Sequence, residues 1–116
     1  MSEKLKYEEI QPSEREELET TFKSNDVNAI CDALYSAAQH EQDWRWSQEQ
    51  CLKMLNHESL LVRSTALIAI GEIAVYRGHL DLETALPEIH RATSDSALAP
   101  FAEDAMDLIR AAKLLQ

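Results

Sequence analysis

The sequence predicts an all-α protein, built as a short α-solenoid of about three stacked helical hairpins. Composition is the first reason, because 2 glycines and 3 prolines in 116 residues leave little material for β-turns. A repeat is the second reason, because apolar positions recur at one fixed offset, and hairpins that repeat in this way bury their apolar sides by stacking. We expect a single domain over residues 1–116, with a flexible N-terminal segment at residues 1–12.

The first hairpin is expected near residues 13–40. Ser13 followed by Glu16 has the spacing of a capping box, which predicts a short helix from this point. Asp26 then supplies the N-cap of a second helix, in which apolar residues recur at helical spacing as far as about His40. The apolar stripe of this second helix consists of Val27, Ile30, Cys31, Leu34 and Ala38.

The second hairpin is expected near residues 43–77, with Asp43 and Ser59 as the N-caps of its two helices. Its second helix is the most apolar element of the chain and is therefore the predicted central helix. Gly71 in the middle of that helix costs about 1 kcal/mol relative to alanine, which indicates close approach of a neighbouring helix. Gly78 has the position of a C-cap.

The third hairpin is expected near residues 81–114. Asp81 caps its first helix, and Pro87 should kink that helix or delay its start. The last helix should begin near Pro100, because proline is tolerated in a first turn. This hairpin repeats the one before it at an offset of 36 residues: Val62, Ala66, Ala69, Ile70 and Ile73 recur as Leu98, Ala102, Ala105, Met106 and Ile109.

Residues 55–66, LNHESLLVRSTA, resemble a HEAT repeat, in which a polar turn precedes Val-Arg and a small residue follows three positions on. The resemblance implies a structural role for Arg63. Ala99 occupies the position at which this arginine would recur in the next unit, as expected for a terminal capping repeat.

A longer span is similar to a set of small bacterial HEAT-like proteins, several of which accompany polymorphic toxins as immunity proteins, including those of contact-dependent growth inhibition. The segments that carry the similarity are DWRW at 43–46, QCL at 50–52, VR at 62–63, IG at 70–71, LDL at 80–82, LP at 86–87 and AEDA at 102–105. This resemblance implies an inhibitor that binds a toxin domain, often a nuclease, in the cytoplasm of the producing cell.

Charge narrows the class of partner. The chain has 21 acidic and 11 basic residues, for a net charge of −10, which disfavours nucleic acid as a ligand because such binding relies on lysine and arginine. Acidic residues dominate from Asp81 to Asp107, where Arg91 is the one base. The acidity either serves solubility or attracts a basic protein partner, and nuclease domains present basic surfaces.

The apolar stretches are too short to span a membrane, and residues 1–9 lack the apolar core of a signal peptide. We therefore expect a cytoplasmic protein that does not bind membranes and is monomeric when free. In that compartment Cys31 and Cys51 should stay reduced.

No sequence pattern supports catalysis. The pairs His40-Glu41 and His57-Glu58 resemble the ligands of HEAT-like di-iron hydroxylases, but they fall in breaks between helices rather than on facing helices. We expect no metal and no cofactor, and no serine or cysteine lies in a nucleophile motif.

The candidate partner-binding residues follow two helical rows and include one tryptophan. They are Trp46, Ile68, Glu72, Tyr76, Glu103, Asp104 and Asp107. Two alternatives remain open: the acids form a solvated charged face, and Trp44 and Trp46 both pack at the entrance of a hairpin. The first functional hypothesis is an immunity protein, the second is a HEAT-like scaffold or adaptor for another cytoplasmic partner, and the third is a helical-repeat hydroxylase or lyase.

Overall fold

The computed structural model describes residues 14–115, so the segment expected at residues 1–12 and the cap expected at Ser13 lie outside it. Every regular element among the described residues is an α-helix, which confirms the predicted fold class. The helices are α1 (Arg15–Phe22), α2 (Val27–His40), α3 (Trp44–Met54), α4 (Leu60–Arg77), α5 (Leu82–Ala92) and α6 (Ala99–Ala111).

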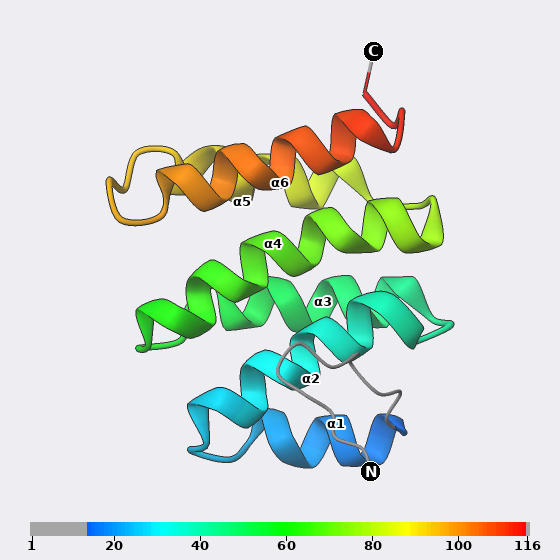
Figure 1. The fold of residues 1–116 in the computed structure, drawn as a ribbon, viewed down its shortest axis with the longest axis vertical. Helices are drawn as coiled ribbons and strands as arrows, with labels where there is room; N and C mark the ends of the chain where they lie inside the picture. Colours follow the sequence, from blue (N-terminus) through cyan, green and yellow to red (C-terminus); the bar gives the residue numbers. More distant parts are fainter. Residues whose placement is uncertain (1–13, 116) are drawn as a thin grey trace, which may run out of the picture.

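The six helices pair into the three expected hairpins, α1–α2, α3–α4 and α5–α6, which stack along the longest axis of the molecule (Figure 1). Helices α2, α4 and α6 form one layer, and α1, α3 and α5 form the other. Helix α4 packs against α2, α3 and α6, which makes it the central helix that the sequence predicted.

Most helix ends are fixed by the expected caps. The side chains of Asp26, Asp43, Ser59 and Asp81 accept backbone hydrogen bonds at the starts of α2, α3, α4 and α5. Gly78 ends α4 in the left-handed conformation, with φ of 70°, which costs glycine little.

One local expectation is wrong, and for Pro87 one of the two expected effects, a delayed helix start, is excluded. The N-cap of α1 is Glu14, which forms a capping box with Glu17, so the helix begins one residue later than the expected Ser13–Glu16 pair. Glutamate can replace serine here because its carboxylate also accepts a backbone N–H. Pro87 lies inside α5, which begins at Leu82 without delay.

The core follows the 36-residue repeat. Nine of the ten repeated residues are buried, and Met106 is half-buried. Helices α4 and α6 approach closely at Gly71, where an added Cβ would lie 2.8 Å from Leu108 Cδ1 and 3.2 Å from Ala105 Cα. The close approach predicted from this glycine is confirmed.

Three further side chains have the structural roles expected of them. Arg63 Nη1 donates to the carbonyl oxygens of His57 and Glu58, at 2.8 and 3.0 Å, and so holds the turn between α3 and α4. Cys31 and Cys51 are both buried and free.

Candidate binding surface

The seven residues predicted to bind a partner lie in three places. Ile68, Glu72 and Tyr76 follow one side of α4, where i, i+4 and i+8 positions line up. Four others lie on α6 and α3. We describe the α4 group first, because it lies in the middle of the stack.

Glu72 is the only charged member of the α4 group. Its carboxylate Oε1 accepts one hydrogen bond, from Gln39 Nε2 of α2, at 3.1 Å. None of the four ion pairs found within residues 14–115 involves Glu72. Partial burial raises the pKa of Glu72 above its usual range, and the Gln39 hydrogen bond opposes that rise. Among the residues that the structure describes, Glu72 is therefore a half-buried carboxylate that forms no ion pair.

The Arg77 side chain bonds to α2 and forms no ion pair with Glu72. Arg77 is the nearest basic residue on α4, and its Nη2 donates to the backbone carbonyl of Gln39 at 3.0 Å. This bond anchors Gln39 at the C-terminal end of α2. Tyr35, one helical turn before Gln39, has its pKa raised by burial and by the negative charge of Glu72.

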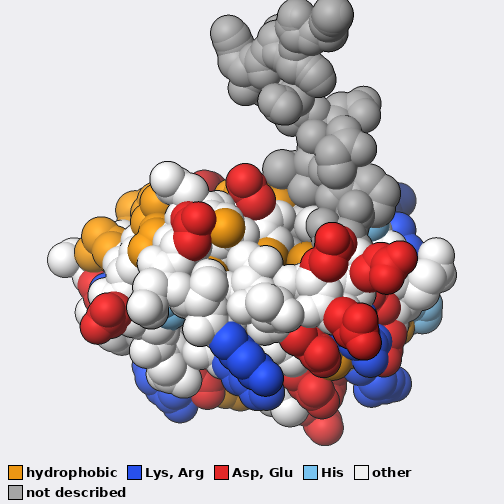
Figure 2. Space-filling model, turned by 90° about the horizontal axis from the view of Figure 1, so that it is seen from below, with side chains coloured by type: hydrophobic (Ala, Val, Ile, Leu, Met, Phe, Trp, Pro, Cys, Tyr) orange, Lys and Arg blue, Asp and Glu red, His pale blue; other side chains and the backbone are white. Residues whose placement is uncertain are grey.

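Exposed hydrophobic side chains are confined to the same layer. Among the described residues, the large hydrophobic side chains that are exposed are Leu60, Leu61, Val75 and Tyr76 of α4 and Phe101 of α6. Tyr76 and Val75, which flank Glu72, keep 52% and 46% of their surface exposed. Seen from the α1 end, hydrophobic side chains gather at the upper left, and acidic side chains dominate the right of the view (Figure 2). This patch lies on the side of the molecule where α4 begins, whereas Val75 and Tyr76 lie near the end of α4. Exposed apolar surface is typical of an interaction site.

The predicted acids of α6 point in two directions. Leu108 and Ala105 face Gly71, so this side of α6 adjoins α4. Asp104 lies one turn before Leu108 and stays near that boundary. Glu103 and Asp107 lie about 100° around the helix from Asp104 and Leu108, respectively, away from α4 and toward the free end of the stack. All three acids are exposed.

Trp46 lies apart from both groups, at the α1 end of the molecule. Its ring centroid is 6.3 Å from that of Phe22, and the guanidinium carbon of Arg15 lies 4.5 Å above it. The indole is therefore half-buried at a hairpin entrance, as the packing alternative expected. A groove of about 450 Å³ runs beside it, lined by Glu19, Phe22, Lys23, Trp46, Glu49, Gln50, Lys53 and Met54.

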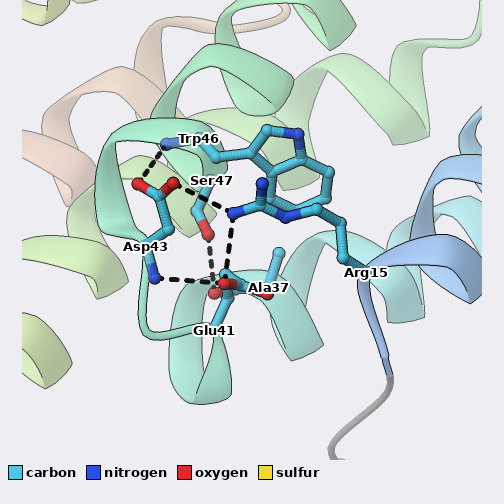
Figure 3. Close-up of polar contacts among 6 residues, drawn as sticks. All are labelled: Arg15, Ala37, Glu41, Asp43, Trp46 and Ser47. Carbon is cyan, nitrogen blue, oxygen red and sulfur yellow. Dashed lines mark hydrogen bonds and ion pairs between the residues drawn. The ribbon is translucent and has the colours of Figure 1, made fainter.

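The Arg15 guanidinium links α1 to the turn before α3 (Figure 3). Arg15 Nη2 lies 3.0 Å from Asp43 Oδ2 and 3.3 Å from Glu41 Oε2. Asp43 also accepts a hydrogen bond from the backbone N–H of Trp46. The hydrogen bond from Arg15 is the main reason why the pKa of Asp43 lies below its usual range, and the Trp46 N–H lowers this pKa further. These contacts explain why Trp46 packs against α1.

Trp44 has a different environment. Its ring stacks on that of His79, with 5.5 Å between the ring centroids. The guanidinium carbon of Arg45 lies 4.5 Å from the centroid of the Trp44 ring.

Among residues 14–115, no group of three His, Cys, Asp or Glu side chains could hold a metal ion. Nor is any helix in this range both long and apolar enough to cross a membrane.

Sequence reasoning missed the residues that surround Glu72. Gln39 and Tyr35 belong to α2, and their approach to Glu72 depends on how α2 and α4 pack. Val75 and Phe101 carried a weaker indication in the sequence, because each is an apolar residue outside the main stripe of its helix.

The chain matches no protein-family model, and no curated protein matches it. Among solved structures, it is similar to a chain in the crystal structure of the CDI complex from Cupriavidus taiwanensis LMG 19424. The two chains are 26% identical with a TM-score of 0.85, over 96% of this chain and 100% of that chain. The similarity thus extends over nearly the whole hairpin stack.

Proposed function

We propose that this protein is an immunity protein, which binds a cognate antibacterial toxin domain and blocks it. The main support is the similarity to a chain of a CDI complex, where we take CDI to stand for contact-dependent growth inhibition. Such a complex pairs a toxin domain with its inhibitor. The same class of protein is implied by the resemblance of residues 43–105 to bacterial HEAT-like immunity proteins. In this role the protein acts in the cytoplasm as a monomer, by binding rather than catalysis.

The negative net charge of this protein favours a toxin domain with a basic surface, and a nuclease is the class of toxin that fits best. A net charge of −10 suits a partner whose own substrate is a polyanion, because that partner presents a basic surface. The acids Glu103, Asp104 and Asp107 are exposed and can steer such a partner toward the neighbouring α4 group, Ile68, Glu72 and Tyr76. Trp46 is a further contact at the edge.

The test is expression in a bacterial host with and without the C-terminal domain encoded by the gene immediately upstream. We expect the upstream domain alone to stop growth, this protein alone to be harmless, and the two together to restore growth and copurify. Toxicity of this protein itself would assign it to the opposite role in the complex. A harmless upstream domain would remove the main support and favour a HEAT-like scaffold or adaptor.

Steering by the α6 acids is tested by binding kinetics at two salt concentrations. Higher salt should slow association strongly, and changing Glu103, Asp104 and Asp107 to lysine should slow it further without unfolding the domain. Changing the exposed Glu16, Glu19 and Glu83 to lysine provides a control with the same change of net charge. Equal slowing by both sets would mean that overall charge, and not this group of acids, steers the partner.

A further inference from the structure

We propose that the toxin domain inserts an arginine beside Glu72, with apolar side chains around it that pack on Ile68, Val75, Tyr76 and Phe101. This inference rests on the proposed function and specifies the contact at the centre of the interface. We call the surface formed by these five residues and Gln39 the α4 face.

The first support is the unpaired charge of Glu72. A carboxylate that is partly removed from water is costly unless a cation or several hydrogen bonds compensate it. Glu72 has one hydrogen bond from Gln39, and its four-residue neighbours on α4, Ile68 and Tyr76, carry no charge. A cation supplied by a partner would compensate the carboxylate, and this gain is specific to the complex.

The second support is the surrounding apolar surface. Val75 and Tyr76 flank Glu72 on α4, and both are about half exposed. Phe101 of α6 is also exposed; because Ala105, one turn after it, adjoins Gly71, Phe101 lies on the Ile68 side of Glu72 and not beside Val75 and Tyr76. A partner that covers these side chains excludes water from Glu72, which strengthens an ion pair formed there. Tyrosine and arginine are also the residues that most often dominate interfaces.

Arginine fits this position better than lysine. The guanidinium group is planar and weakly hydrated, so it tolerates a half-buried site and can stack on an aromatic ring such as that of Tyr76 while it pairs with a carboxylate. The side-chain amide of Gln39 donates to Glu72 Oε1, and the backbone carbonyl of Gln39 accepts from Arg77. The carboxylate of Glu72 is therefore fixed in position before the partner binds.

The structure predicts opposite effects of one substitution on stability and on binding. Glu72→Gln removes a charge that burial disfavours, so the free variant should unfold at the same temperature as the wild type or higher. The same variant should bind the upstream toxin domain about 30-fold more weakly or worse, because the partner arginine would be left unpaired. Glu58→Gln makes the same chemical change at an exposed site in the α3–α4 turn and should leave the affinity within about threefold.

Binding should also depend on pH through Glu72. Burial raises the pKa of the free carboxyl and a bound cation lowers it, so the affinity should fall as pH decreases through the free-state pKa, and Glu72→Gln should remove this component. The charge of Glu72 acts on Tyr35 of α2 and Cys51 of α3, and Asp104 of α6 lies one turn before Leu108, which adjoins α4. Tyr35 and Cys51 stay neutral in this range, and Asp104→Asn controls for the third group.

Two outcomes would overturn the inference. If the toxin domain binds the wild type and Glu72→Gln equally, the α4 face is wrong while the immunity role stands. If the upstream domain does not bind at all, the proposed function fails. The Glu72 site is then tested separately, by titrating N-acetyl-arginine amide into the isotope-labelled protein and following the NMR spectrum. Shifts at Glu72, Gln39 and Tyr35 that vanish in Glu72→Gln support the site. Shifts confined to Glu103 and Asp107, or none, refute it.

Discussion

Gly71→Ala tests the packing of the second hairpin against the third, because helix propensity and sterics predict stability changes of opposite sign. In an isolated helix, alanine is favoured over glycine by about 1 kcal/mol. In this fold the new Cβ would lie 2.8 Å from Leu108 Cδ1, 2.9 Å from Leu108 Cβ and 3.2 Å from Ala105 Cα. Carbon atoms pack at about 3.5–4.0 Å, so α6 must move away by several tenths of an ångström.

The steric effect should win. Leu108 Cδ1 can rotate away, but Leu108 Cβ and Ala105 Cα are fixed to the α6 backbone. Overpacking of this kind costs about 1–3 kcal/mol. Taking the middle of that range, and subtracting the propensity gain of about 1 kcal/mol, gives a net loss of about 1 kcal/mol. For a domain of this size, that loss lowers Tm by about 4 °C.

The assay is urea and thermal unfolding followed by circular dichroism. Leu108→Ala removes the Cδ1 contact and leaves the Cβ contact, so the Gly71→Ala penalty should shrink in that background without disappearing. Gly78→Ala is a contrasting case, since no atom lies within 4 Å of its added Cβ and the cost comes from φ of 70° alone. An increase in stability for Gly71→Ala would refute the close approach of α4 and α6.

Three other substitutions or reactions test the fold. Ile70→Ala truncates a fully buried side chain and should lower the free energy of unfolding by about 2–5 kcal/mol, so an unchanged urea midpoint would show that Ile70 is not core. Arg63→Ala releases two carbonyl oxygens of the α3–α4 turn and should cost about 1–3 kcal/mol, measured in the same way. Burial raises the pKa of the Cys51 thiol to about 12, so Cys51 should resist iodoacetamide at pH 8 until urea unfolds the protein, and rapid native alkylation would contradict its burial.

Helix positions were predictable because caps act over three or four residues. Asp26, Asp43, Ser59 and Asp81 each bond a backbone N–H within their own first turn, so their effect can be identified from neighbouring residues. The exact start of α1 could not be predicted in this way, because two overlapping pairs, Ser13-Glu16 and Glu14-Glu17, both have the spacing of a capping box.

The candidate surface was only partly predictable, because it depends on contacts between hairpins. The row of Ile68, Glu72 and Tyr76 follows from helical spacing alone. The separation of Glu103 from that row depends on the rotation of α6, which the packing of Leu108 against Gly71 fixes. The Gln39–Glu72 hydrogen bond joins residues 33 positions apart and has no local indication in the sequence.

The placement of Glu103 and Asp107 has a consequence for self-association. A stack of hairpins has an open end at which a second copy could add as the next repeat, much as an edge strand can recruit another chain. Helix α6 forms that end here (Figure 1), and these two exposed carboxylates lie on its outward side. Two such ends brought together would set like charges against each other and strip them of water. We therefore expect these acids to disfavour the pairing of two α6 ends.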